Sequence, residues 1–255
     1  MIRASDVGGP GTIASVLAEM QVRLDALPAG REPQREFLGT YKRTTAAVAT
    51  AIEQAAFEDP RWVEEWDVAF AGLYLAALDA DLAGAAGVPR PWRLAFGAPA
   101  GLPPLRHVLL GINAHINYDL PQALLAVISD DEFEDQALLA RRSRDHERID
   151  AVLAGRVAAE ENELGSQASV SLLDRALSPL NRLASKRFLS EARQKVWLNT
   201  IELHRARTAG PDALAIRLAE LELLSAARIA DLLAPGQVLL RLAVAGFGVL
   251  LPPPA

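Results

Sequence analysis

Cysteine is absent from the 255 residues of this chain, which excludes disulfide bonds, thiolate metal sites and a cysteine nucleophile. Aromatic residues make up only 5% of the chain, and histidine occurs four times. No run of residues approaches the roughly 20 apolar side chains of a membrane-spanning helix. The N-terminal residues lack the apolar core of a signal peptide. These absences predict a cytoplasmic protein with no membrane span.

A cluster of basic residues is also missing. The chain has 26 Lys and Arg against 32 Asp and Glu, a net charge of -6, and the two signs are interspersed. Nucleic-acid binding therefore is not expected. The glycine-rich stretch 8–11 lacks the lysine of a phosphate-binding loop, and neither G-x-S-x-G nor H-E-x-x-H occurs. The remaining partner class is a small-molecule ligand or substrate.

Hydrophobic residues make up 51% of the chain and recur at helical spacing, without the alternation that marks strands. We predict an all-α fold, an irregular multi-helix bundle in which residues 12–255 form a single domain after a tail at 1–11. Five prolines between 84 and 104 predict a crossover loop. The predicted helices begin at Thr12, run over 36–57, begin again at Asp59-Pro60, and cover 130–165, 169–180, 181–207 and 211–234. We expect the apolar C-terminal segment to pack against them.

The stretch 109–125, LLGINAHINYDLPQALL, places polar side chains inside an apolar segment. His115 and Asp119 are four residues apart and share one helical face, and Asn113 and Asn117 form a second pair at that spacing. Buried polar groups are costly unless they have partners. Pro121 predicts that the helix bends or restarts here.

Two interpretations of this stretch bear on function. In the first, His115 and Asp119 bind a divalent metal ion, since an imidazole and a carboxylate one turn apart can reach the same ion. Further ligands would come from other helices, and the candidates are Asp67, Asp145, His146 and Asp150. In the second, His115 is a general base oriented by Asp119, while Asn113 and Asn117 position the substrate. A buried polar network that only fixes helix packing is the structural alternative.

The sequence NAHINYDLPQAL, with FEDPRWVEEWDVAFAGLYLAAL before it and DHERIDAVL after it, resembles the bacterial domain-of-unknown-function family 5995. The family hallmark N-A-H-I-N-x-D-L-P is matched position by position over 113–121. The resemblance extends from about Thr12 to beyond Trp197. It implies a site at this motif and no particular activity.

A more distant similarity links the same segment with the helical zinc-dependent nucleases and phospholipases C, in which a His is followed four residues later by an Asp, and then by an apolar residue, Gln and Leu. The residues at those spacings here are His115, Asp119, Leu120, Gln122 and Leu124. Those enzymes have a further histidine where this chain has Leu125, and they need more histidines than four. A trinuclear zinc cluster is therefore not expected, whereas a one- or two-metal carboxylate-rich site remains open.

Three functions follow from these patterns. The first is an enzyme with a polar His, Asp and Asn site in the bundle core, either a metal-dependent hydrolase or a metal-free cyclase of specialised metabolism. The second is a protein that binds a small hydrophobic molecule between its helices. The third is a structural helical protein without catalysis.

Overall fold

The computed structural model describes residues 11–165, 172–236, 246 and 248–253, with side chains described at these positions except 105, 150, 153–165 and 172–190. Ten α-helices and one π-helical turn, η2, make up its regular structure, and no strand occurs in these ranges. The all-α prediction is confirmed. The elements are α1 (Ile13–Ala26), α2 (Glu32–Glu53), α3 (Pro60–Leu82), α4 (Arg90–Phe96), α5 (Pro104–Ala114), η2 (His115–Asp119), α6 (Leu120–Val127), α7 (Asp130–Glu134), α8 (Gln136–Gly165), α9 (Leu172–Ala209) and α10 (Pro211–Leu233).

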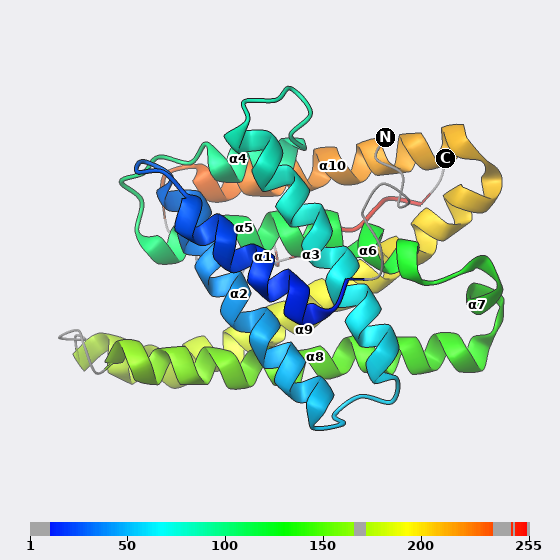
Figure 1. Ribbon diagram of the computed structural model, residues 1–255, viewed down its shortest axis with the longest axis horizontal. Coiled ribbons are helices and arrows are strands. Elements are labelled where there is room, and N and C mark those ends of the chain that lie inside the picture. Colours follow the sequence, from blue (N-terminus) through cyan, green and yellow to red (C-terminus); the bar gives the residue numbers. More distant parts are fainter. Residues whose placement is uncertain (1–10, 166–171, 237–245, 247, 254–255) are drawn as a thin grey trace.

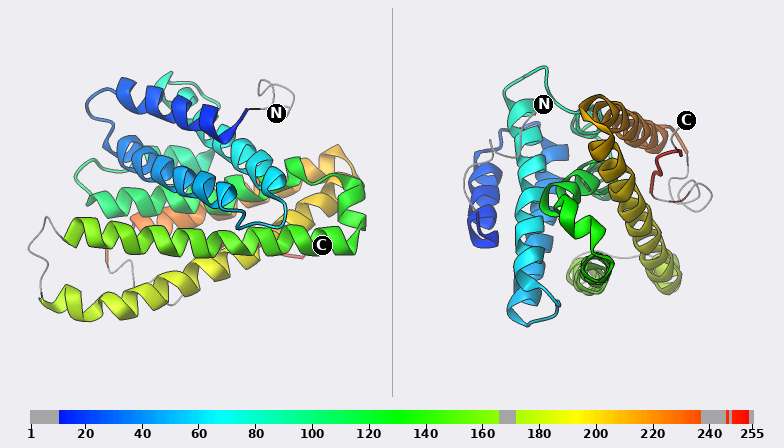
Figure 2. Two further views of the ribbon diagram at one scale, coloured as in Figure 1. Left: turned by 60° about the horizontal axis from the view of Figure 1, so that its bottom comes forward. Right: turned by 90° about the vertical axis from the view of Figure 1, so that its right-hand side faces the viewer.

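The segment α5–η2–α6 lies at the centre of the bundle (Figure 1). On one side, α2 packs against α5, and α3 packs against α6. On the other side, α9 contacts α6, and α10 contacts α5. The long helix α8 runs along one edge beside α2 and α9, as the two further views in Figure 2 show. The predicted motif therefore occupies the most enclosed part of the fold.

Local sequence signals set several helix ends as predicted. Thr12 caps α1, and its hydroxyl accepts a hydrogen bond from the Ser15 backbone N–H. Asp59 caps α3 in the same way through the Trp62 N–H, with Pro60 at the first helical position. Gly210 precedes α10 with a φ of 128°, which a residue with a Cβ rarely adopts.

Several predicted segments differ in the structure. Helix α2 covers Glu32–Glu53 rather than 36–57, because Pro33 is compatible with the first turn of a helix and Ala55, just past its end, has a positive φ of 53°. The predicted helix 130–165 is divided into α7 and α8 at Asp135, whose carboxylate accepts hydrogen bonds from the Ala137 and Leu138 N–H groups. The predicted pair 169–180 and 181–207 is one helix, α9, which continues through the position of Pro179. The predicted crossover loop 84–104 contains α4, whose N-cap is Pro89 and whose first turn holds Pro91.

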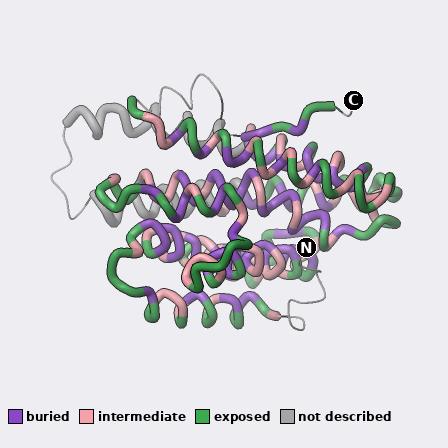
Figure 3. Tube along the Cα trace, turned by 90° about the horizontal axis from the view of Figure 1, so that it is seen from above, coloured by how far each residue is buried: buried purple, intermediate pink, exposed green. Residues whose placement is uncertain are grey.

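Buried positions follow the inward faces of the helices, and exposed ones lie mainly outside (Figure 3). One large hydrophobic cluster joins α1–α6 with parts of α8, α9 and α10. A smaller cluster contains Leu125, Leu203 and Leu221 together with Val249 and Leu251 of the C-terminal segment. The described part of that segment therefore packs against the helices, as predicted. Within the described ranges no helix is long and apolar enough to cross a membrane.

Close packing of α2 on α5 depends on Gly111. A Cβ atom at this position would lie 2.2 Å from Cδ2 of Phe37, well inside van der Waals contact. Because Gly111 has no side chain, the Phe37 ring can lie directly against α5, one turn before His115. The absence of a side chain at Gly111 thus helps to position one wall of the candidate site.

Candidate functional site

The NAHIN motif includes a π-helical turn. Helix α5 ends at Ala114, η2 covers His115–Asp119, and the Leu120 N–H donates to the His115 carbonyl, five residues earlier. Pro121 has no N–H to donate, so the α-helical ladder is already interrupted at this point. A single π turn in an α-helix costs stability and is often found at functional sites. The predicted bend near Pro121 is therefore a change of helical pitch.

The side chains of His115 and Asp119 are hydrogen-bonded directly to each other. The His115 Nδ1 atom lies 2.9 Å from Asp119 Oδ2, and the same oxygen accepts a 2.8 Å hydrogen bond from the Trp92 indole N–H. The His115 and Asp119 side chains are 4% and 3% exposed. The His115 Nε2 atom is buried and has no hydrogen-bond partner among the described residues. The arrangement orients the imidazole through one nitrogen and leaves the other available for chemistry.

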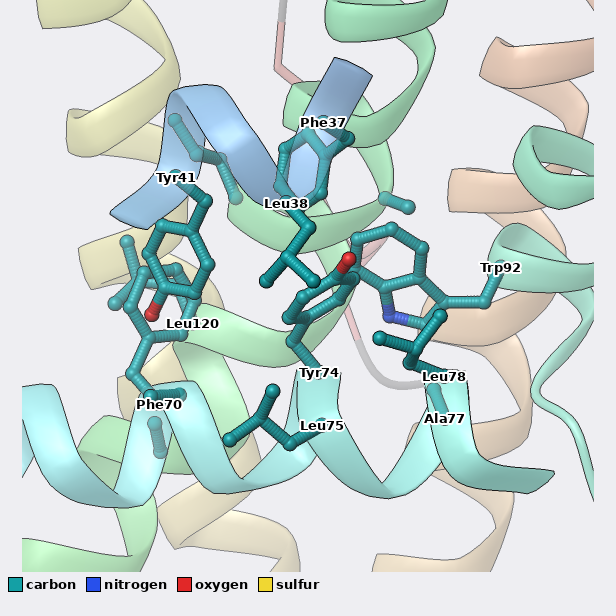
Figure 4. Close-up of a cluster of buried hydrophobic side chains, with 14 of the residues drawn as sticks. Phe37, Leu38, Tyr41, Phe70, Tyr74, Leu75, Ala77, Leu78, Trp92 and Leu120 are labelled. Carbon is teal, nitrogen blue, oxygen red and sulfur yellow. The ribbon is translucent and has the colours of Figure 1, made fainter. Parts of the chain in front are cut away.

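Five aromatic rings surround the His115 imidazole. Phe70 stacks on it with ring centroids 3.5 Å apart and planes inclined by 6°, and Tyr41 meets it edge-on at 4.4 Å. Phe37, Tyr74 and Trp92 lie with their centroids 5.8 to 5.9 Å away. Figure 4 shows Phe37 and Tyr41 extending from α2 towards Phe70 and Tyr74 of α3, with Trp92 entering from one side. The site is therefore apolar apart from the His115–Asp119 pair and the tyrosine hydroxyls.

This apolar environment opposes charge on both partners. Burial lowers the pKa of His115 well below its usual value. Burial also raises the pKa of Asp119 well above its usual value, and the hydrogen bond from Trp92 opposes that shift only in part. Both directions follow from the loss of hydration, which penalises the charged form of each group. The ion pair of imidazolium and carboxylate is thus disfavoured here, and the two groups titrate as a coupled pair.

The two predicted asparagines make hydrogen bonds within their own helix and to the C-terminal segment. Asn113 donates to the Leu109 carbonyl of its own helix, and Asn117 donates to the Asn113 side-chain oxygen. Asn117 also accepts a hydrogen bond from the backbone N–H of Val249 at 3.3 Å. From the other side, Asn199 of α9 donates to the Val249 carbonyl. The motif asparagines therefore tie the C-terminal segment to the central helix.

The other carboxylates named as metal ligands lie in different surroundings. Asp145 is fully buried, accepts 2.8 Å hydrogen bonds from the Glu58 and Asp59 backbone N–H groups, and pairs with Arg148. Asp145 thus holds the segment before α3. The neighbouring His146 contacts the rings of two tryptophans, Trp66 and Trp197. The Asp150 side chain lies outside the described residues.

Asp67 differs from the buried Asp119 and Asp145, whose carboxylates accept hydrogen bonds. Its side chain lies on the same broad face of α3 as Phe70 and Tyr74, and the residue is 8% exposed. Burial raises the pKa of Asp67 to about 7, with a further contribution from Glu64. Its Oδ2 atom has no hydrogen-bond partner among the described residues. A carboxyl group in this state carries a desolvation cost that no contact offsets.

The described members of the predicted metal donor set lie in separate surroundings. Asp119 Oδ2 already accepts two hydrogen bonds, so it orients His115 and does not turn with it towards a shared ion. Among side chains that the structure describes, no three histidine, aspartate or glutamate residues are placed so that they could hold a metal ion. A metal at His115, Asp119, Asp67, Asp145 and Asp150 stays a prediction, and we derive no chemistry from it.

Sequence reasoning missed Trp92 and gave Tyr41 only a core role. Trp92 lies in the proline-rich stretch after Val88, where no helical period marks it. Phe37 and Tyr41 are four residues apart on α2, a spacing that is typical of a buried face and carries no sign of a site. Asn199, which binds the C-terminal segment, was likewise indistinguishable from an ordinary polar residue of a long helix.

Comparison with known proteins supports the resemblance that the motif suggested. The model of a family of unknown function (DUF5995) matches residues 13–235, so this chain belongs to that family. Searches of curated proteins and of solved structures return no significant match. No match connects the chain with the helical zinc-dependent nucleases and phospholipases C, and that distant similarity stays a prediction.

Proposed function

We propose that this protein is a metal-free enzyme that removes a proton from a small, largely apolar molecule, with His115 as the base. The observation that supports this proposal is the continuous chain from the Trp92 N–H through Asp119 to His115 Nδ1, while the buried Nε2 remains without a partner among the described residues. In His115 the unpartnered nitrogen belongs to a ring that Asp119 orients through the other nitrogen, which is the arrangement of a histidine general base.

The proposed proton transfer is a relay within the His115–Asp119 pair. In its basic form the pair holds one proton, on Nδ1, and carries a single negative charge on the carboxylate. When Nε2 takes a proton from the substrate, the Nδ1 proton moves to Asp119 Oδ2, and the pair becomes neutral. Because burial raises the pKa of the Asp119 carboxyl, this neutral form is favoured and the pair is a stronger base than imidazole alone.

The aromatic surroundings indicate the class of substrate. Rings from α2, α3 and α4 face His115, and their polar groups are the tyrosine hydroxyls and the Trp92 N–H, which already donates to Asp119. A flat or cyclic hydrocarbon skeleton with one activated C–H or O–H bond matches such walls. This substrate class is also compatible with the cyclisation chemistry considered from the sequence.

The base-catalysed ring opening of 5-nitrobenzisoxazole tests the proposal. In this reaction the base removes the ring C–H proton, the N–O bond breaks, and a coloured cyanonitrophenolate forms, so no co-reactant is needed. We expect the wild-type protein to exceed free imidazole at equal concentration, and His115→Gln to lower the rate by about 10²-fold, the low end for general base catalysis. Asp119→Asn should also lower the rate.

His204→Gln is the matched control. His204 is a largely buried histidine on α9 that stacks on Phe133, which is not one of the five rings around His115. Its replacement should leave the rate unchanged. Equal rates for the wild-type protein and for His115→Gln would contradict the proposed function.

A structural role for the same residues is the competing function. The observation that favours it is the close stacking of Phe70 on His115, which fills one face of the imidazole. This alternative predicts that Asp119→Asn destabilises the fold by about 1–3 kcal/mol, as expected when a buried hydrogen-bond network loses a partner. It also predicts that neither His115 nor Asp119 affects proton removal from the probe.

A further inference from the structure

The last described residues of the chain are held in place by side chains of α9 and α10. Residues 248–253 form neither helix nor strand, and their backbone groups are bonded to other elements. Asn199 of α9 is fully buried; its side chain donates to the Val249 carbonyl at 3.0 Å and accepts from the Leu251 N–H at 2.9 Å. Arg217 of α10 donates to the Pro252 carbonyl at 2.6 Å. The backbone of the C-terminal segment is therefore fixed from two helices.

The C-terminal segment also lies close against α9. A Cβ atom at Gly248 would lie 3.0 Å from the Ala192 Cα atom and 2.8 Å from Lys195 Cδ, so a side chain here would force the segment away from the helix. The two residues on either side of Leu250 are buried in the smaller hydrophobic cluster, while Leu250 itself is 48% exposed. The segment thus has one defined position on the helices.

A chain of hydrogen bonds connects this segment with the central helix. The Val249 N–H donates to Asn117 Oδ1 at 3.3 Å, Asn117 Nδ2 donates to Asn113 Oδ1 at 3.2 Å, and Asn113 Nδ2 donates to the Leu109 carbonyl at 2.9 Å. Both asparagines are buried. All donors in this chain point the same way, so each hydrogen bond polarises and strengthens the next.

The chain of hydrogen bonds enters the turn that carries the candidate site. Asn117 lies in the middle of η2, which also contains His115 and Asp119. Residues two positions apart on a helix point in roughly opposite directions, and here His115 contacts rings of α2, α3 and α4 while Asn117 binds the C-terminal segment. The Leu120 N–H closes the π turn on the His115 carbonyl. Because a π turn is rare and less favourable than an α turn, contacts from outside the helix have to hold it.

We propose that the C-terminal segment positions the π turn and, through it, the His115 ring. Asn199 fixes Val249, Val249 fixes Asn117, and Asn117 holds η2 so that His115 stays stacked on Phe70 with its Nδ1 at Asp119. Asn117 and Asn199 are positioning residues in this account, and neither touches the substrate. The hold on η2 does not depend on any reaction, whereas its effect on proton removal rests on the function proposed above.

Hydrogen exchange in Asn199→Ala tests the inference in the full chain. The substitution removes both hydrogen bonds of the Asn199 side chain to the C-terminal segment and leaves every residue of η2 unchanged. The Leu120 amide should exchange about five- to tenfold faster, the effect of one lost hydrogen bond, whereas the Leu75 amide of α3 should change less. A Leu120 amide that is unaffected, or that accelerates only by the same factor as Leu75, overturns the inference, because nothing beyond a general loss of stability then reaches η2.

A control and a second variant make the exchange test specific. Leu198 neighbours Asn199 on α9 and is 49% exposed, so Leu198→Ala should leave the exchange at Leu120 as in the wild type. Val249→Pro removes the N–H that donates to Asn117, retains a compact apolar side chain and changes no helix. It should produce the same selective acceleration at Leu120. Exchange at Leu120 that is equal in Val249→Pro and the wild type overturns the inference, whatever the fate of Asn199→Ala.

The proton resonances of the His115 ring report its position without turnover. Phe70 stacks on this ring with centroids 3.5 Å apart, so the ring current of Phe70 displaces the His115 ring protons from their ordinary chemical shifts. Asn199→Ala and Val249→Pro should each move these resonances towards the ordinary values. Resonances that stay at the wild-type positions in both variants overturn the inference, because the ring is then positioned without the C-terminal segment.

The ring opening of 5-nitrobenzisoxazole connects the C-terminal segment with the proposed function. Asn199→Ala should lower kcat more than it raises KM, because the substitution disturbs the orientation of the base and not the contacts with the probe. A kcat equal to that of the wild type overturns the positioning of His115 for catalysis. A wild-type protein that does not accelerate the reaction overturns the proposed function alone, and the exchange and resonance measurements still decide whether the segment positions η2.

Discussion

Replacing Asp67 by asparagine should change how the stability of the protein depends on pH. The pKa of this carboxyl is about 7 in the folded protein, against 3.8 for an ordinary aspartate in an unfolded chain. A tenfold change in an acid dissociation constant corresponds to about 1.4 kcal/mol, so the difference between 3.8 and about 7 corresponds to about 4 kcal/mol. This is the largest penalty on the fold that we can assign to a single group with a stated pKa.

The direction of the effect follows from which state loses its proton first. As pH rises from about 4, the unfolded chain ionises at Asp67 while the folded protein retains the proton. The free energy of unfolding therefore falls with rising pH until pH passes about 7, and then this contribution is constant. Between about pH 4.5 and about pH 7 the ionisation of Asp67 should lower the free energy of unfolding by about 3 kcal/mol.

Asparagine retains the shape of the side chain and cannot ionise. At about pH 7, Asp67→Asn should be more stable than the wild type, by about 4 kcal/mol less the 1–3 kcal/mol that an unpaired buried amide costs. Near pH 4.5 this advantage should shrink by about 3 kcal/mol. Urea unfolding of both proteins at several pH values measures the difference in stability. The contributions of the other titrating groups cancel in this difference, because both proteins contain them.

Asp145→Asn serves as the control for removal of a buried carboxyl. It should be less stable than the wild type at about pH 7, because Asp145 pairs with Arg148. If the difference between Asp67→Asn and the wild type is the same at about pH 4.5 and about pH 7, Asp67 is not a buried proton carrier and the reasoning is refuted.

Three other substitutions test the packing around the site. Gly111→Ala should destabilise the protein by about 1–3 kcal/mol, because the new Cβ would meet the Phe37 ring at 2.2 Å, and thermal unfolding measures this; unchanged stability would contradict the packing of α2 on α5. Asn199→Ala should increase hydrogen exchange at the Leu251 amide, which now donates to the Asn199 side chain at 2.9 Å, and unchanged protection there would exclude this contact. Trp92→Phe should remove the hydrogen bond to Asp119 and cost about 1–3 kcal/mol in urea unfolding, and an unaffected midpoint would show that the indole N–H has no such role.

The sequence predicted the helical architecture because its signals are local. Apolar spacing along α1 and α3, and the caps Thr12 and Asp59, depend on residues within one or two turns. Proline was less informative, since it is compatible with the first turn of a helix: α2, α4 and α5 all have proline there. Helix α4 was therefore missed within a stretch that its prolines marked as a loop.

The candidate site was predicted only in part, because its partners come from distant segments. The spacing of His115 and Asp119 predicted their contact, which the structure contains at 2.9 Å. Trp92, which fixes the Asp119 carboxylate, is 27 residues away in sequence, and no pattern links the two. The role of Asn117 in binding Val249 depends on a pairing across 132 residues. Tertiary contacts of this kind leave no periodic trace in a single sequence.

The protonation of His115 tests the central claim most directly. Side-chain ¹⁵N NMR of the wild-type protein, with His115→Gln used to assign the signals, follows both ring nitrogens as pH changes. Burial lowers the pKa of the imidazolium well below its usual value, so the His115 ring should remain a neutral imidazole as pH falls through the ordinary histidine midpoint. Conversion to imidazolium with an ordinary midpoint near about pH 6.5 would contradict the account, because it would show that the ring is hydrated and is not held in an apolar site by Asp119.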